Sequence, residues 1–236
     1  MLKTSLALSL VLVAGCAHTP TAPRTAGAIP VPTTPPADAL LHPGQATKTA
    51  PAVYRVRFET SRGPFVVEVH RTWAPNGADR LYNLVALHFY DGAAFFRVLD
   101  GFVAQFGLSP YPKVNTVWDE AKIPDDPVTQ SNVAGTLTFA TAGPNTRTTQ
   151  LFVNLADNPR LDKMGFSPVG KVVKGMGVVR SLYSGYGEGA PQGTGPSQEI
   201  LEARGNGFLA RRFPKIDFIV GASIVEPSAG GPSTAR

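Results

Sequence analysis

Short stretches of alternating apolar and charged residues, separated by turns, are the feature that most constrains the fold of this chain. In "VYRVRFETSRGPFVVEVH", Tyr54, Val56 and Phe58 alternate with charged residues, a turn follows at 61–63, and the alternation resumes over 65–70. Alternation with a period of two is typical of a strand that buries one face. Two such runs joined by a tight turn predict a β-hairpin.

Further short strands are expected along the rest of the chain, at 95–99, 102–106, 135–140, 150–154, 167–173 and 217–225. Only two segments, 78–88 and 176–183, place apolar residues at helical spacing. Many strands and few helices favour a mainly β fold, a closed or nearly closed antiparallel barrel whose ends two helices cover. The Gly-rich segment 184–213 interrupts this pattern before the last strand. We expect it to be an insertion on the outside, with one short helix near 198–204.

The first sixteen residues, "MLKTSLALSLVLVAGC", combine a basic start, about ten apolar residues and small residues at the end, as signal peptides do. The apolar run is too short to span a bilayer. It closes on "VAGC", which resembles the bacterial lipobox and implies cleavage before Cys16 and acylation of its thiol. The alternative is an ordinary signal peptide that is cut beside Ala17 and removes Cys16.

The lipobox resemblance implies a lipid-anchored protein of a bacterial envelope, with its domain in the periplasm. Because Ala17 and not Asp follows Cys16, the outer membrane is preferred. Residues 17–51 are rich in Pro, Thr and Ala and poor in large apolar residues, so we expect a disordered tether. As polyproline II, at about 3.1 Å per residue, it would reach about 100 Å. The globular domain then spans 52–226, and a disordered tail is expected at 227–236.

Composition and motifs argue against several other functions. The formal net charge is +5, but Lys and Arg are scattered and form no basic stripe, so no nucleic-acid partner is expected. The segment "GYGEGA" fits part of a dinucleotide fingerprint without the βαβ context that such a site needs. The four histidines lack metal-ligand spacing, and Cys16 is the only cysteine, so no metal and no internal disulfide are expected.

The segment "AAFFRVLDGFVAQFG" places Arg97 and Gln105 among phenylalanines, where an unpartnered buried arginine would be costly. Together with "GTLTFATAGPNTRTTQLFVN", it resembles the two signature segments of cyclophilin-type peptidyl-prolyl isomerases. The similarity covers residues 52–226. It implies an eight-stranded antiparallel barrel capped by two helices. It also implies an isomerase that needs no cofactor and acts on X-Pro bonds of unfolded or flexible polypeptides, as a monomer.

The resemblance also assigns roles to individual residues. Arg97 corresponds to the catalytic arginine, and Gln105 would hold it and bind the substrate backbone. The other positions that match the substrate groove are Phe102, Val103, Phe139, Ala140, Thr141, Gln150, Phe152, Leu161 and Phe166. Of these, Phe102, Phe152, Leu161 and Phe166, with Val103 beside them, would grip the pyrrolidine ring of proline. Residues 139–141 correspond to the strand that holds the substrate backbone.

Some residues depart from the family pattern, and other functions stay open. Phe96 stands where the family usually has His, and Leu108 also departs from the usual sequence; we interpret both as changes at the edge of the groove. Phe166 replaces another usual His, which keeps an aromatic wall but loses a polar contact. Arg97 could instead be a strand arginine that points into solvent. The chain could also be a chaperone or adaptor that binds proline-containing segments without catalysis, or it could dock to an envelope protein through its insertion.

Overall fold

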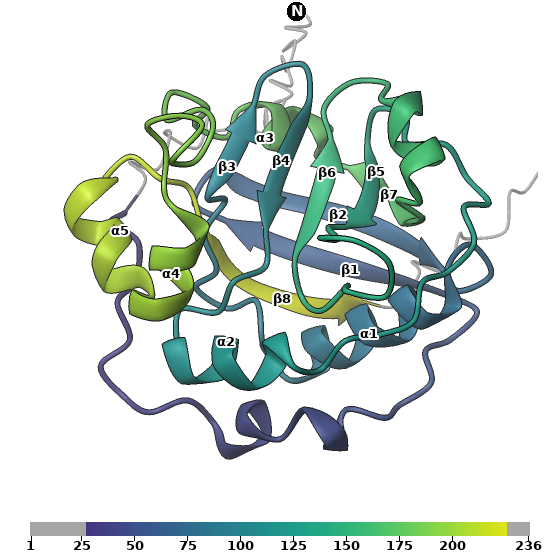
Figure 1. Cartoon of the computed structure of the whole chain (residues 1–236), viewed down its shortest axis with the longest axis horizontal. Coiled ribbons are helices and arrows are strands. Elements are labelled where there is room, and N and C mark those ends of the chain that lie inside the picture. Colours follow the sequence, from purple (N-terminus) through teal and green to yellow (C-terminus); the bar gives the residue numbers. More distant parts are fainter. Residues whose placement is uncertain (1–26, 226–236) are drawn as a thin grey trace, which may run out of the picture.

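The computed structural model describes residues 27–225, which form one antiparallel sheet with helices packed around it (Figure 1). The strands are β1 Val53–Thr60, β2 Gly63–His70, β3 Arg97–Leu99, β4 Val103–Phe106, β5 Thr136–Phe139, β6 Leu151–Asn154, β7 Pro168–Lys174 and β8 Ile219–Val225. Their order across the sheet is β3-β4-β6-β5-β7-β2-β1-β8, and all neighbours are antiparallel. The prediction of a mainly β fold is confirmed.

Strands β1 and β2 form the predicted hairpin, in which Val53 pairs with His70 and Thr60 with Gly63. Gly63 has a φ of 116°, a conformation that favours glycine because it has no Cβ. Phe58 and Phe65 face each other across the pair, fully buried, with their ring centroids 4.9 Å apart. The alternation in the sequence therefore sets which side chains enter the core.

The sheet curls without closing, which corrects the expected closed barrel. Strands β3 and β8 are its edges, and within residues 27–225 the β-bridge that links these two sides is the single pair Ala94–Phe218. Strand β3 has only three residues, and its ladder partner is β4. The insertion 184–213 contacts this side of the sheet, where Glu188 pairs with Arg97. Covering an edge in this way shields it without closure.

Helix α1, Pro75–Ala86, confirms the first predicted helix with an earlier start and buries Leu81, Leu84 and Val85. Pro75 lies in the first turn of this helix. Proline is tolerated there because the N–H that it lacks would have no hydrogen-bond partner within the helix. The second predicted helix is shorter than expected, because α3 spans only Met176–Arg180. Helix α2, Pro112–Asp119, is not among the predicted elements; it buries Val114 and Trp118, too few apolar positions to reveal a helical period. No helix within residues 27–225 is long and apolar enough to cross a membrane.

Residues 27–51 pack against the domain, which corrects the prediction of a disordered tether over this part of the chain. Leu40, in the 3-10 helix η1, Asp38–Leu41, is buried, and its carbonyl accepts a hydrogen bond from Trp118 Nε1 at 2.8 Å. A second 3-10 helix, η2, Pro43–Gln45, follows. In Figure 1 this purple segment runs along the outside, below α2 and α1. Cys16, residues 17–26 and the tail from 226 lie outside the described residues.

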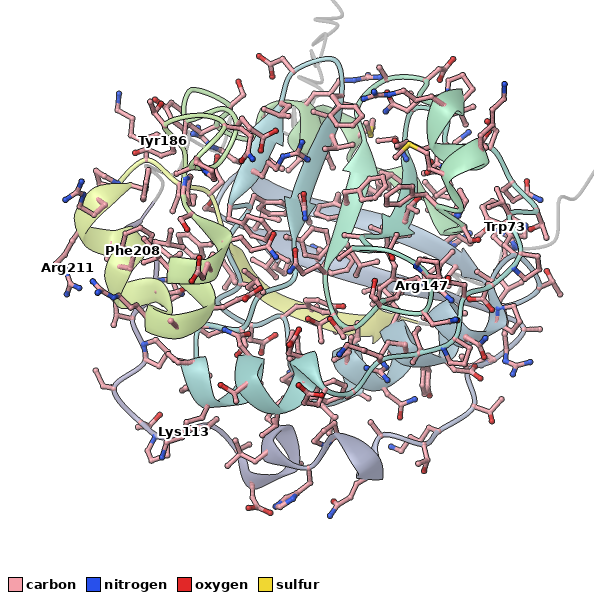
Figure 2. The ribbon with its side chains drawn as sticks, viewed as in Figure 1. Trp73, Lys113, Arg147, Tyr186, Phe208 and Arg211 are labelled. Atoms are coloured by element: carbon pink, nitrogen blue, oxygen red, sulfur yellow. The ribbon has the colours of Figure 1, made fainter. Side chains whose placement is uncertain are left out.

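The insertion 184–213 packs outside the sheet, as expected. Helix α4, Gln198–Arg204, confirms the predicted helix, and α5, Asn206–Arg212, is an additional one. The insertion and neighbouring segments form an apolar cluster that is separate from the main core inside the sheet. This second cluster contains Ile29, Ala94, Phe96, Leu108, Leu201, Leu209, Phe213, Ile216 and Phe218. Tyr186 and Phe208 pack against this cluster (Figure 2).

The second cluster explains the departures from the family pattern at Phe96 and Leu108. Phe96 is only 3% exposed and Leu108 only 5%, so neither lies at a groove edge, which corrects that interpretation. Both belong to the cluster that Leu201, Leu209 and Phe213 of the insertion complete. An apolar side chain at each position therefore gives the insertion a surface to pack on.

Candidate functional site

Three side chains of the candidate site lie in one row across neighbouring strands. Arg97 of β3 is opposite Gln105 of β4, and Gln105 is opposite Phe152 of β6. Directly opposed residues of antiparallel strands project from the same face of a sheet. Ala104 and Phe106 alternate with Gln105 and are fully buried in the main core. The strand register therefore places a guanidinium, an amide and a phenyl ring side by side on the outer face.

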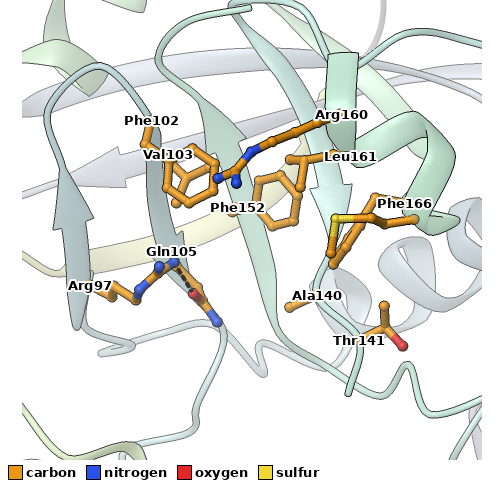
Figure 3. A pocket seen from close by; sticks show the side chains of 11 residues that line it. Arg97, Phe102, Val103, Gln105, Ala140, Thr141, Phe152, Arg160, Leu161 and Phe166 are labelled. Carbon is orange, nitrogen blue, oxygen red and sulfur yellow. Dashed lines mark hydrogen bonds between the residues drawn. The ribbon is translucent and has the colours of Figure 1, made fainter. Parts of the chain in front are cut away.

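This row borders a cavity of about 350 Å³ (Figure 3). The cavity is lined by Arg97, Phe102, Val103, Gln105, Ala140, Thr141, Phe152, Arg160, Leu161, Met164 and Phe166. Nine of the eleven residues that the sequence assigned to the groove thus meet in one place. Arg97 faces this cavity and Glu188, not open solvent, which argues against its being an unpartnered surface arginine.

The other two predicted residues lie elsewhere. Phe139 is 1% exposed and belongs to the main core, which corrects its assignment to the groove; its strand position turns it to the inner face. Gln150 lines a second cavity of about 290 Å³, which shares Gln105, Ala140 and Thr141 with the first. Its Oε1 accepts a hydrogen bond from Gln105 Nε2 at 3.0 Å. Gln150 therefore contacts the site through Gln105.

The apolar wall of the cavity is a small cluster separate from the main core. Val103, Phe152 and Leu161 are buried in it, and Phe102, Ala140 and Phe166 pack against them. The rings of Phe152 and Phe166 meet edge to face at a centroid distance of 5.7 Å and an angle of 67°. Leu161 comes from the 3-10 helix η3, Pro159–Met164. The wall is thus built where η3 folds back onto the outer face of β4 and β6.

A polar network around the fully buried Asn132 and Thr138 side chains holds this wall in place. Asn132 Nδ2 donates to the carbonyl of Phe166 and to Asp162 Oδ1, both at 2.8 Å, and its Oδ1 accepts from Thr138. Burial raises the pKa of Asp162, but hydrogen bonds from Ser131 and Asn132 outweigh it, so the pKa lies below its ordinary value. Satisfied buried networks of this kind fix one geometry.

Arg97 has partners at all three of its nitrogens. Its Nε donates to Glu188 Oε1 at 2.6 Å, its Nη2 to Glu188 Oε2 at 2.8 Å, and its Nη1 to Gln105 Oε1 at 3.2 Å. The guanidinium carbon also lies 5.6 Å from the centroid of the Phe102 ring, and the guanidinium carbon of Arg160 lies 5.0 Å from the same centroid. The Arg97 guanidinium, helped by the N–H of Gly189, holds the pKa of the Glu188 carboxyl below its ordinary value.

Three residues of the site are missing from the sequence prediction. Arg160 and Met164 line the cavity, and Glu188 pairs with Arg97 from the insertion. Arg160 could have been predicted because it is adjacent to Leu161 in the sequence. Nothing in the sequence connects Glu188 to Arg97, which lies 91 positions away. Among residues 27–225, no group of three or more His, Cys, Asp or Glu side chains is placed to hold a metal ion.

The chain thus combines an eight-stranded antiparallel sheet with an arginine beside an apolar notch on its outer face. The family model for cyclophilin type peptidyl-prolyl cis-trans isomerase/CLD matches residues 55–202. The chain belongs to this family, and its activity is that of a peptidyl-prolyl cis-trans isomerase.

Individual relatives agree with the family match. "Peptidyl-prolyl cis-trans isomerase-like 1" of Neurospora crassa is 34% identical over 131 residues, 54% of this chain and 79% of that protein. A peptidyl-prolyl cis-trans isomerase of Acinetobacter baylyi is 33% identical over 137 residues, 54% of this chain and 70% of that protein. The crystal structure of a Cryptosporidium parvum cyclophilin superposes with a TM-score of 0.54 at 19% identity, over 74% of this chain and 99% of that one. This last likeness concerns the fold.

Proposed function

We propose that Arg97 is the catalytic residue and that the cavity beside it binds the proline of an X-Pro segment. Rotation about a peptide bond is opposed by about 18–20 kcal/mol, because the nitrogen lone pair is conjugated with the carbonyl. Halfway through the rotation this conjugation is lost and the lone pair is localised on nitrogen. A cationic N–H donor at that nitrogen stabilises the transition state more than either ground state.

The observation that carries this proposal is the juxtaposition of the Arg97 guanidinium and the wall of Phe152, Leu161 and Phe166 in one cavity. An apolar notch holds the pyrrolidine ring and fixes one side of the bond. The other side turns while a guanidinium N–H meets the nitrogen. A charge-assisted hydrogen bond contributes about 1.5–3 kcal/mol, which corresponds to about 10- to 150-fold in rate. Exclusion of water from the groove adds to this effect.

The amides beside Arg97 bind the substrate backbone in this proposal. Gln105 lines both cavities and Gln150 lines the second, so the two side chains lie along one path over the sheet. Ala140 and Thr141 form the border between the cavities. We propose a monomer as the active unit. The substrates are flexible polypeptides that expose proline.

The experiment is an exchange measurement by NMR on a short X-Pro peptide, with the full chain and its Arg97→Ala variant. The wild type is expected to accelerate cis-trans exchange, and the variant to lose most of this acceleration. Equal acceleration by both proteins would exclude Arg97 as the catalytic residue. Suppression of client aggregation that is equal in both proteins, without catalysed exchange in either, would favour a chaperone or adaptor.

We also propose that Cys16 is acylated and holds the domain in the periplasm of a bacterial envelope, on the outer membrane, where it acts on folding envelope proteins. The support is the "VAGC" lipobox pattern. Because the chain packs on the domain from residue 27, only residues 17–26 separate the anchor from the body, at most about 35 Å of extended chain. Metabolic labelling with a fatty acid, compared between the wild type and Cys16→Ser, tests the anchor; equal labelling would exclude it.

A further inference from the structure

The insertion 184–213 reaches the candidate site through one side chain. Glu188 forms a two-pronged ion pair with Arg97, at 2.6 Å to Nε and 2.8 Å to Nη2. Both side chains are partly exposed, 24% for Arg97 and 37% for Glu188. A planar fork of this kind fixes the orientation of a guanidinium as well as its position. The pair occupies the two nitrogens that do not contact Gln105.

The loop that carries Glu188 is folded tightly around this residue. The N–H of Gly189 donates to Glu188 Oε1 at 3.0 Å, and the N–H of Gly195 donates to the Glu188 carbonyl at 2.8 Å. A Cβ on Gly193 would lie 2.3 Å from that same carbonyl oxygen, so the turn needs glycine there. At the start of the insertion, Ser184 Oγ donates to Asp100 Oδ2 at 2.9 Å, next to the turn between β3 and β4. Backbone N–H groups of the same loop therefore fix the position of the Glu188 carboxylate.

The carboxylate supports the arginine from outside the cavity. Glu188 is not among the residues that line either cavity at the site, whereas Arg97 and Gln105 line the first. The space for a proline ring beside Phe152 and Phe166 thus stays open while the ion pair is formed. The contact constrains the guanidinium without filling the notch.

We propose that Glu188 is a positioning residue for Arg97, so that the insertion is a working part of the active site. Glu188 holds Nε and Nη2 and presents Nη1, together with Gln105, to the substrate. This inference rests on the proposed catalytic role of Arg97. Displacement of a reacting group by about 1 Å can lower the reaction rate by up to about 100-fold. Because the Glu188 pair is partly exposed, we expect a loss of about 10-fold in kcat/KM when the carboxylate is removed.

The test measures kcat/KM for cis-trans exchange of an X-Pro peptide with the full chain and three variants, Glu188→Ala, Glu188→Gln and Glu188→Asp. We expect about 10-fold loss in the Ala and Gln variants and partial recovery in the Asp variant, which keeps the charge on a shorter arm. Glu199→Gln is the matched control, because it removes the same charge from an exposed position of the same insertion. It is expected to keep the wild-type value.

A second readout separates positioning from mere support of the loop. The ¹⁵N–¹H resonance of Arg97 Nε, assigned by its loss in Arg97→Lys, is expected to move and broaden in Glu188→Gln but not in Glu199→Gln. Unchanged or higher kcat/KM in Glu188→Ala, or an unchanged Nε resonance in Glu188→Gln, would overturn the proposal. If Arg97→Ala is inactive while Glu188→Ala is fully active, only the inference fails. If Arg97→Ala is fully active, the proposed function itself fails.

Discussion

Gln105 accepts a hydrogen bond from Arg97 across the β3–β4 ladder, with 3.2 Å between Nη1 and Oε1. The other end of the same amide donates to Gln150 Oε1 at 3.0 Å. These two bonds fix which end of the Gln105 amide faces the guanidinium. The polar residues that interrupt the apolar segment 93–107 are therefore partnered on the outer face of the sheet. The apolar residues that alternate with them form the core.

Removal of the Phe166 ring is expected to weaken substrate binding more than the chemical step. The ring forms one side of the notch, edge to face with Phe152, and in the proposed mechanism it contacts the proline ring in the ground state and the transition state alike. Phe166→Ala should therefore raise KM about 10-fold and leave kcat nearly unchanged, as loss of uniform binding does. Full exchange kinetics over a range of peptide concentrations check this. A fall in kcat with constant KM would contradict the assignment of Phe166 to the proline pocket.

Asp126 is expected to be a major contributor to stability. It accepts hydrogen bonds from the N–H groups of Asn76 and Gly77 at the start of α1, and it pairs with Arg147 Nη1 at 3.1 Å. Arg147, labelled in Figure 2, is only 2% exposed, so its charge needs this partner. Asp126→Ala should lower the free energy of unfolding in urea by about 3–5 kcal/mol.

The neighbouring carboxylate gives the control for this prediction. Asp125 also lies near Arg147, at 3.2 Å from Nε, but its side chain is 37% exposed. Asp125→Ala should cost about 1 kcal/mol or less, as partly exposed pairs do. Equal losses in the two variants would show that burial of Asp126 does not set its contribution.

The packing of residues 27–51 predicts a stability effect in a segment whose composition is typical of disorder. Leu40→Ala should lower the free energy of unfolding by about 2–4 kcal/mol, because it leaves a cavity next to the indole of Trp118. Val31, in the same segment, is 47% exposed, and Val31→Ala should change stability by less than about 0.5 kcal/mol. Urea unfolding measures both. If Leu40→Ala behaves like Val31→Ala, the segment does not pack as described.

Asp79 is expected to make the attachment of this segment sensitive to acid. Burial raises the pKa of Asp79, but hydrogen bonds from Arg71 and from the N–H of Ala50 outweigh it, and the pKa falls below its ordinary value. The ionised carboxylate is therefore favoured by folding. Its contribution is present above the unfolded pKa of about 3.9 and is lost as pH falls through the lower pKa of the folded protein.

The measurement is the free energy of unfolding at about pH 6 and about pH 3. The wild type should lose more stability between the two than Asp79→Asn, which has no carboxylate to protonate at this position. Glu120→Gln serves as the control, because the Glu120 side chain is 82% exposed. It should keep the wild-type pH dependence. Identical pH dependence in all three proteins would contradict the role of Asp79.

The sequence predicts what local periodicity and family motifs encode. The period-two alternation identified the β1–β2 hairpin, and the two signature segments identified most residues of the cavity. Phe139 was misassigned because a motif marks a strand without marking which of its faces a given residue occupies. The prediction of a closed barrel was wrong because alternation within a strand carries no information on whether the two edge strands of the sheet pair with each other.

Long-range contacts escaped prediction for a different reason. The Leu40 carbonyl accepts a hydrogen bond from an indole 78 positions away, and Glu188 pairs with Arg97 across 91 positions. Each contact depends on a few residues that have no special spacing. The insertion looked like a Gly-rich loop, yet its glycines are what allow the backbone to fold tightly around Glu188.

We infer that the guanidinium of Arg97 acts in a fixed orientation beside the proline notch. The most direct test compares the catalysed cis-trans exchange rate of an X-Pro peptide for the wild type, Arg97→Lys and Arg97→Ala, with thermal unfolding to confirm that each protein is folded. Lysine keeps the charge but not the planar fork. This role of Arg97 predicts a loss of about 10- to 150-fold in kcat/KM for both variants, with the lysine variant much closer to the alanine variant than to the wild type. Wild-type rates in folded Arg97→Ala would contradict it.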